Sequence, residues 1–486
     1  MADYDLAVIG GGLTGASVAR DAAGRGLWVA LFEQGDLASG ASSASSRLMV
    51  GDLQRLERRA LASVRRSLVE RDRQLRLAPH LVRPLRFVIP LHPQGRPVWL
   101  LRLGLSVYDR LGAGPPASTT LDLSHHEAGF SLQRPYGSAF EFSDAVADDA
   151  RLVILNAVDA AARGAVIRTR ARCVRADRDA EWRLALIDRG RRSTVTARAL
   201  VSAVGAWTGQ FAETVLRRAP PRLALFRESQ IIVARLFDHD RVYVLQQPGG
   251  GLVFAQRYDE ERTLIGMASA AFDGDVAAAS PSAADIIELC SAANRYFREQ
   301  ISPADVVATT CAVRPRPVGR GRPDVPRAGV MQLDRRYGEA PLVIAFGGDM
   351  TSYRLQAERI VDALASFYVK ADPWTTEAPL PGGDFTDLDA QLDATLRRYP
   401  FLAAAELRRL VLAYGTRVKD VLGEMTSGQD PGPVFGAELT AAEVRYLMQT
   451  EWARTAEDVL WRRSKLGLSM PQVARNALAQ FMQSVA

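Results

Sequence analysis

Three glycines near the start of the chain, Gly10, Gly12 and Gly15, follow the spacing GxGxxG. The apolar run 4–9 before them predicts a buried parallel strand, and the pattern over 16–26 predicts a helix. At this spacing the first glycine permits a tight turn, the second lets the backbone approach a pyrophosphate, and the third lets the helix pack on the strand. The helix N-terminus offers N–H groups to the phosphates, so the segment predicts a dinucleotide site.

Glu33 supports this prediction and narrows the choice of cofactor. It follows a second predicted strand over 27–32 and lies eighteen residues after Gly15. A carboxylate at this place accepts hydrogen bonds from the adenosine ribose hydroxyls. Because the same carboxylate repels a 2′-phosphate, it disfavours NADP.

Three later segments favour FAD over a nicotinamide cofactor. Segment 40–47, GASSASSR, offers small hydroxylated residues to the second phosphate and the ribityl chain, although its composition also fits a flexible linker. Two predicted strands end in glycine turns, at 199–205 and at 342–348, and a helix is predicted after the second turn. A second helix N-terminus suits the pyrimidine edge of a flavin, which is negative in the reduced state.

The expected cofactor is therefore FAD, held by residues of these segments and of a further short segment at 173–174. The candidate cofactor-binding residues are Gly10, Gly12, Thr14, Gly15, Glu33, Ser42, Ser43, Ser45, Ser46, Cys173, Val174, Gly205, Trp207, Gly347, Gly348, Asp349, Met350 and Thr351.

Read in order, nearly the whole chain resembles the FAD-dependent glycerol-3-phosphate dehydrogenases. The matching segments include ASSASSRL at 41–48, SDAVADDARLVILNA at 143–157, SAVGAWTGQF at 202–211, VRP at 313–315, the pattern FGGxxTxYRxxAE at 346–358, LPGG at 380–383 and EVRYLMQTEWARTAEDVLWRRSKLGL at 443–468.

The resemblance implies an α/β (α+β) fold built from three parts. A Rossmann-type FAD-binding domain over 1–385 is interleaved with an antiparallel-sheet substrate cap, which lies mainly at about 75–140 and 215–315. A C-terminal helical domain over 386–486 follows, and we assign it a structural role because it carries no cofactor motif.

The chain departs from this family in segments that surround the substrate. Where the family reads K-L-x-H-G-G-L-R-Y-L-E, residues 47–57 read RLMVGDLQRLE. Val50 thus stands in place of a histidine, and Gln54 and Arg55 stand in place of an Arg-Tyr pair. These three residues are substrate-pocket candidates.

Further departures remove positive charge. The usual K-G-S-H is RESQ, so Gln230 replaces a second histidine, and Asp349 stands where the family carries a lysine after the double glycine. A second arginine of the family is replaced by Met331, unless Arg327 nearby takes its place. Arg314 in the VRP segment is retained, and it and Met331 complete the substrate-pocket candidates.

These departures affect the substrate more than the cofactor. Two unit charges 4 Å apart interact by about 4 kcal/mol at an effective dielectric constant near 20, so Asp349 should weaken phosphate binding strongly. We expect hydride transfer from an alcohol or amine carbon to flavin N5, with a small-molecule or carrier-tethered substrate other than free glycerol 3-phosphate. The catalytic candidates are Arg314, Gln230 and Asp349; Asp349 is the candidate base, and a helix N-cap is its alternative role.

Two alternatives stay open at this stage. The chain could be a true sn-glycerol-3-phosphate dehydrogenase or oxidase, as the resemblance alone implies. It could also be a non-enzymatic flavin-binding relative whose pocket has decayed. The compound that reduces the bound flavin would separate these readings.

Composition limits the partners. The 486 residues carry a net charge of +6, which does not favour nucleic acid, and the three cysteines form no CxxC, so we expect no metal site. Segment 53–77 is basic with a helical apolar period, which suits either an anionic membrane surface or an ordinary packed helix. We expect a cytoplasmic protein and leave open a peripheral site on the inner face of the membrane, a quinone or other electron acceptor, and a homodimer.

Overall fold

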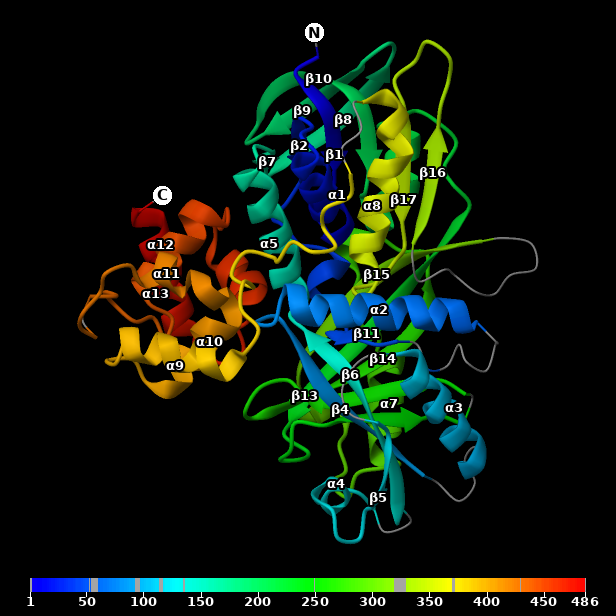
Figure 1. Cartoon of the computed structure of the whole chain (residues 1–486), viewed down its shortest axis with the longest axis vertical. Helices are drawn as coiled ribbons and strands as arrows, with labels where there is room; N and C mark the ends of the chain where they lie inside the picture. The colour runs from blue at the N-terminus through cyan, green and yellow to red at the C-terminus, as the bar shows by residue number, and fades with distance from the viewer. Residues whose placement is uncertain are drawn as a thin grey trace.

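Two β-sheets and a C-terminal group of helices make up the chain (Figure 1). The computed structural model describes residues 2–51, 53, 60–91, 97–112, 117–133, 136–248, 250–318, 329–368, 372–428 and 430–485. In this part of the chain, no helix is both long enough and apolar enough to cross a membrane.

The first sheet has a parallel centre that is buried on both faces. Its strand order is β16 (Val330–Asp334), β17 (Leu342–Phe346), β10 (Arg191–Ser202), β1 (Tyr4–Ile9), β2 (Val29–Phe32) and β7 (Val166–Arg168), with the antiparallel pair β8 (Ala171–Arg178) and β9 (Trp182–Asp188) attached to β10. Along β1, Leu6 and Val8 face one side and Ala7 and Ile9 the other, and all four are buried. Burial on both faces explains why these strands read as continuous apolar runs.

Helices cover one face of this sheet. They are α1 (Leu13–Gly24), α5 (Asp149–Ala162) and α8 (Tyr353–Leu364), whose apolar side chains share one core with the sheet. The opposite face packs against the β8–β9 pair and α6 (Thr208–Thr214). This is the doubly covered arrangement that parallel sheets require.

The second sheet is largely antiparallel and comes from two separate stretches of chain. Its order is β15 (Val306–Pro317), β11 (Leu223–Ala234), β14 (Arg262–Phe272), β13 (Leu252–Arg257), β12 (Val242–Gln246), β4 (Val82–Pro90), β6 (Ser138–Ala147) and β3 (Leu48–Met49), with β5 (Thr119–Asp122) on β6. Helix α7 (Ala283–Asn294) packs on one face; α2 (Leu61–Leu77) and α3 (Val98–Leu111) pack on the other, and the short α4 (Glu127–Phe130) follows β5. Strands of the first sheet lie between the two stretches in sequence, so the two sheets are interleaved.

The C-terminal helices form their own core. They are α9 (Leu388–Arg398), α10 (Ala404–Tyr414), α11 (Val418–Leu422), α12 (Ala441–Thr450), the π-helical turn η8 (Asp458–Arg463) and α13 (Gln472–Ser484). The predicted α/β fold with an antiparallel second sheet and a helical C-terminus is confirmed; the exact domain boundaries stay a prediction.

Buried ion pairs attach this helical group to the first sheet. Arg151 on α5 donates to Glu451 at 3.0 Å, and Arg463 pairs with Asp36 at 2.7 Å. All four side chains are at most 2% exposed. A buried charge is tolerated only with a partner, so these pairs fix how the two parts meet.

The basic segment around α2 is a packed helix in its described part. Helix α2 begins at Leu61, and it buries Val64, Leu68 and Leu77 against the second sheet and its neighbours. Residues 54–59, which the sequence places in the same helix, lie outside the described residues.

The glycine turn generates the first testable prediction. A Cβ at Gly15 would lie 1.9 Å from the carbonyl oxygen of Gly10, so α1 can approach β1 only with glycine there. We expect Gly15→Ala to push α1 off the turn, to lower the free energy of unfolding by about 1–3 kcal/mol and to reduce cofactor retention, as measured by thermal melting and by bound flavin.

Gly104 provides a matched control. It lies inside helix α3, and a Cβ there would meet nothing within 4 Å. Gly104→Ala should keep the cofactor and raise stability by about 0.5–1 kcal/mol. Equal behaviour of the two variants would contradict the close approach at Gly15.

Candidate active site

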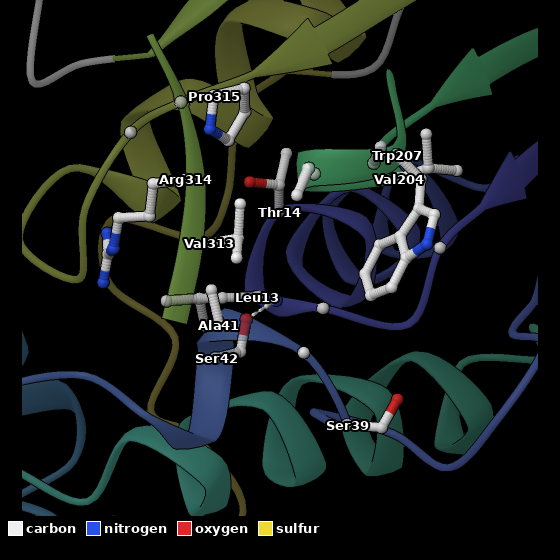
Figure 2. A pocket seen from close by; sticks show the side chains of 18 of the residues that line it. Leu13, Thr14, Ser39, Ala41, Ser42, Val204, Trp207, Val313, Arg314 and Pro315 are labelled. Carbon is white, nitrogen blue, oxygen red and sulfur yellow. Dashed lines mark hydrogen bonds between the residues drawn. The ribbon is translucent and has the colours of Figure 1, made fainter. Parts of the chain in front are cut away.

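A cavity of about 820 Å³ lies where the two sheets meet. It opens at the carboxyl ends of β1, β10 and β17, the place where parallel α/β sheets bind ligands. Figure 2 shows Thr14 near its centre, with Trp207 on one side and Arg314 on the other. The predicted residues that line it are Gly10, Gly12, Thr14, Glu33, Ser42, Ser45, Ser46, Val50, Cys173, Gly205, Trp207, Arg314, Gly347, Gly348, Asp349 and Met350.

The glycine turn forms one end of the cavity. Gly10 has φ +111°, and a Cβ there would lie 2.5 Å from the Ala203 carbonyl oxygen. Helix α1 is N-capped by Gly12, which supplies no side chain, and the Leu13 N–H donates to Ser42 Oγ at 3.1 Å. The helix N-terminus is therefore open towards the cavity, as an anion site needs.

Glu33 stands at the end of β2 beside this turn. Its carboxylate accepts hydrogen bonds from the Gly11 N–H at 2.6 Å and from the Gly35 N–H at 2.7 Å. Burial raises the pKa of Glu33, the two N–H donors lower it, and the net direction is upward. The carboxylate is thus held rigidly at the cavity wall.

The serine loop, residues 41–46, is tied to the C-terminal helices. Ser45 Oγ donates to Asp149 Oδ2 at 2.7 Å, and Lys465 pairs with the same carboxylate. Burial would raise the pKa of Asp149, but Lys465 and Arg47 outweigh burial and hold it below its usual value. Asp149, which lines the cavity, and Lys465 are functional candidates that sequence reasoning missed. One signal for these two residues was present in the sequence: each lies in a segment that resembles the family. The two residues are 316 positions apart in the chain.

The opposite wall comes from β11 and β15. Glu228 on β11 is 6% exposed and lies between two arginines of β15: its Oε2 is 2.7 Å from Arg314 Nε, and its Oε1 is 3.1 Å from Arg316 Nη2. All three line the cavity together with Phe226. Arg314 is therefore already paired within the chain.

Sequence reasoning missed Glu228 and Arg316. One signal was available for Glu228, because the resembled family has a glycine at that place in K-G-S-H. The strand alternation then decides its direction: Arg227 and Ser229 face α7 and pair with Asp285, so Glu228 faces the cavity.

Asp349 lines the cavity and also caps the following turn. Its Oδ1 accepts from Ser352 N at 3.0 Å and from Ser352 Oγ at 2.8 Å, just before α8 begins at Tyr353. Asp349 thus fixes the turn before α8, but it is not the helix N-cap considered from the sequence: the N-cap is Ser352, whose side chain makes no capping hydrogen bond. A catalytic role stays a prediction.

Several predicted residues are not among those that line the cavity. Gln230 is buried, and its Nε2 donates to the carbonyl oxygens of Ala44 and Ser45, both at 3.1 Å, so it joins the serine loop to β11. Met331 lies on β16 and is 38% exposed. Gly15, Ser43, Val174 and Thr351 lie close behind the wall or beside it. Gln54, Arg55 and Arg327 lie outside the described residues.

No described histidine lines the cavity. Burial lowers the pKa of His80 to about 3 and that of His239 to about 4, so both side chains are neutral at physiological pH. Within the described residues, the ionisable side chains that line the cavity are carboxylates, arginines, Cys173 and Tyr353.

The residues present fit FAD. The turn needs glycine where a Cβ would collide, the N-cap of α1 supplies no side chain, and two glycines with positive φ, Gly347 and Gly348, precede α8. The volume suits a ligand larger than a mononucleotide.

Comparison with known proteins agrees with this fit. Residues 5–354 match the family described as FAD dependent oxidoreductase, and residues 373–486 match the C-terminal domain of alpha-glycerophosphate oxidase. Glycerol-3-phosphate dehydrogenase of Pseudomonas aeruginosa is 40% identical over 492 residues, which cover 99% of this chain and 95% of that one. D-erythritol 1-phosphate dehydrogenase of Brucella abortus is also 40% identical, over 99% of this chain and 98% of that one.

Solved structures share the fold. Glycerol-3-phosphate dehydrogenase from Bacillus halodurans, complexed with FAD, aligns with a TM-score of 0.74 at 21% identity, over 99% of this chain and 94% of that one. L-alpha-glycerophosphate oxidase from Mycoplasma pneumoniae, with FAD bound, aligns with a TM-score of 0.60 at 13% identity, over 78% of this chain and 99% of that one. The glycine turn, the two interleaved sheets and these relatives lead to one assignment: the chain is an FAD-dependent oxidoreductase of the glycerol-3-phosphate dehydrogenase family.

Proposed function

We propose that this dehydrogenase oxidises a carbon bearing a hydroxyl or amine group in a substrate other than free glycerol 3-phosphate. One observation carries the proposal: Glu228 lies against Arg314 and Arg316 in the cavity wall, and a second carboxylate, Asp349, lines the same cavity. A phosphate dianion requires several unopposed charge-assisted donors. Counted over the cavity, the carboxylates of Glu228 and Asp349 offset the positive charges of Arg314 and Arg316, which suits an uncharged or cationic group.

The chain's own backbone and a few side chains would hold the cofactor. The α1 N-terminus and Ser42 are placed for the pyrophosphate, Glu33 for the adenosine ribose, and the turn before α8 for the flavin. When bound, FAD supplies the acceptor of the hydride at its flavin N5.

Asp349 is the proposed acceptor for the substrate's hydroxyl or amine proton. It lines the cavity at the turn before α8, and Ser352 orients its carboxylate through two hydrogen bonds. A general base must be held within hydrogen-bond reach of the proton it removes. The described histidines lie elsewhere, and the carboxylates of Glu228 and Asp149 are paired with cations, so Asp349 is the candidate base.

The second candidate function is oxidation of glycerol 3-phosphate itself. The observation that favours it is the name of a relative at 40% identity. A second relative at the same identity is named for D-erythritol 1-phosphate, so relatedness at this level does not decide between substrates.

We further propose that α3 contacts a membrane surface containing anionic lipids. Val98, Trp99 and Leu103 on α3 are 49%, 68% and 55% exposed, an unusual concentration of apolar surface on one helix. A neighbouring hollow, which reaches Leu111 of α3, is lined by Arg65, Arg66, Arg73 and Arg359. Apolar side chains beside cations are typical of interfacial helices.

The quinone acceptor, the homodimer and the cytoplasmic location stay predictions from the sequence.

The proposed ribose contact can be tested at Glu33. Glu33→Arg should weaken FAD retention by roughly 1.5–3 kcal/mol, because it removes a charged hydrogen-bond acceptor. Glu33→Gln, which keeps one acceptor oxygen, should lose less. The measurement is FAD occupancy after dilution and gel filtration; occupancy unchanged in Glu33→Arg would contradict the contact.

The substrate proposal is tested by anaerobic stopped-flow reduction of the flavin. Glycerol 3-phosphate should reduce the wild-type flavin with kcat/KM below about 10⁴ M⁻¹s⁻¹, while full reduction by dithionite shows that the flavin is competent. Asp349→Lys should tighten glycerol 3-phosphate binding by up to about three decades, since it reverses one charge beside the site.

If the wild-type protein has a kcat/KM for glycerol 3-phosphate in the ordinary enzymatic range, the second candidate function, oxidation of glycerol 3-phosphate, is supported instead. A panel of amines and unphosphorylated alcohols run in parallel identifies the substrate class. Failure of every compound to reduce the flavin would instead favour the non-enzymatic alternative.

The membrane proposal predicts that Trp99→Ser combined with Leu103→Ser lowers partitioning onto vesicles with anionic lipid at least tenfold, about 1.4 kcal/mol. Trp28, which is 63% exposed on the first sheet, is the control. Trp28→Ser should leave vesicle binding unchanged in co-sedimentation. Equal losses in both variants would contradict a contact specific to α3.

A further inference from the structure

Glu228 is held between two arginines that would otherwise face the cavity. On β11 it stands opposite Ala312 of β15 and Ser269 of β14, two small residues that leave room for the arginine side chains. Its two carboxylate oxygens contact different guanidinium groups, Oε2 that of Arg314 and Oε1 that of Arg316. Neither oxygen is left to the solvent, because Glu228 is 6% exposed.

Arg316 is fixed by more than this pair. Its Nη2 also donates to Ser269 Oγ at 3.0 Å, and its guanidinium carbon lies 4.1 Å from the centre of the Phe226 ring. An arginine stacked on an aromatic ring and paired with a carboxylate gives up both contacts if it turns to another ligand. These contacts therefore hold Arg316 in its present position.

The contact between Glu228 and Arg314 is close but poorly directed. Arg314 Nε and Glu228 Oε2 are 2.7 Å apart, yet their alignment does not meet hydrogen-bond geometry. Arg314 thus has a partner for its charge without an ideal hydrogen bond. Loss of the Glu228 charge would leave this guanidinium beside the cavity without the carboxylate that now balances its charge.

We propose that Glu228 is a specificity-determining residue. Its carboxylate pairs with Arg314 and Arg316 and thereby excludes phosphate and other oxyanions from this wall of the cavity. An incoming dianion would have to separate the pairs and leave a buried carboxylate uncompensated. The wall accepts uncharged parts of a substrate instead. This inference rests on the proposed function, since it names the feature that sets the substrate class of the same cavity.

The inference predicts that removing one charge converts the wall into an anion site. In Glu228→Gln the side chain keeps its shape, and both guanidinium groups become available to an anion. Titration of the FAD-loaded protein with inorganic phosphate, followed by flavin absorbance, should give saturable binding at least tenfold tighter than in the wild-type protein. In Glu228→Gln combined with Arg314→Gln the gain should disappear.

Glu141 offers a matched control. It is 7% exposed, lies on β6 of the same sheet, and is also held by two arginines, Arg86 at 2.6 Å and Arg241 at 2.7 Å, but it does not line the cavity. Glu141→Gln should be destabilised to a similar extent and show no flavin response to phosphate. If Glu228→Gln does not retain FAD, Glu228→Ala is titrated in its place.

Three results would overturn the inference: phosphate binding in Glu228→Gln no tighter than in the wild-type protein, the same gain in Glu141→Gln, or a gain that survives loss of Arg314. The readout is binding and not turnover, so it is independent of the substrate test. Rapid reduction of the wild-type flavin by glycerol 3-phosphate would refute the proposed function, whereas an unchanged phosphate titration would refute only the role of Glu228.

Discussion

A buried charge needs a partner, and the arrangement of this molecule depends on how that requirement is met around the cavity. Glu228 is buried because Arg314 and Arg316 pair with its carboxylate. At the other end of the cavity, Asp149 is buried because Lys465 reaches it from the C-terminal helices. The first case fixes the charge of the substrate wall, and the second fixes the serine loop.

The same requirement gives the C-terminal helices a role beyond packing. Arg463 with Asp36, and Arg151 with Glu451, are ion pairs that exclude water where the helical group meets the first sheet. Lys465 forms a further ion pair, with Asp149, whose carboxylate lines the cavity. The helical group is thus connected by charge to the residues that surround the cofactor, although it carries no cofactor motif of its own.

The glycine turn and Glu33 could be predicted from the sequence because each follows from local rules, whereas the two interleaved parts of the fold were predicted from the family resemblance. A GxGxxG between an apolar strand and a helix leaves little choice of backbone, and the structure has Gly10 at φ +111° as expected. The substrate wall could not be predicted in the same way. Whether Glu228 or Arg227 faces the cavity depends on the register of β11, and Gln230 and Met331 were placed in the pocket by family position alone. Lys465 and Asp149 meet only through the tertiary fold.

Family membership therefore fixes the cofactor more firmly than the substrate. The residues that we propose to hold FAD are backbone turns and short polar side chains, whereas in our proposal the choice of substrate depends on single charges such as Glu228 and Asp349. The most direct test is a crystal structure of the FAD-loaded wild-type protein soaked with inorganic phosphate. We predict that Glu228 still bridges Arg314 and Arg316 and that no phosphate lies between them. Phosphate bound to both arginines, with Glu228 turned away, would contradict the central claim that Glu228 takes the place of an anionic ligand at Arg314 and Arg316.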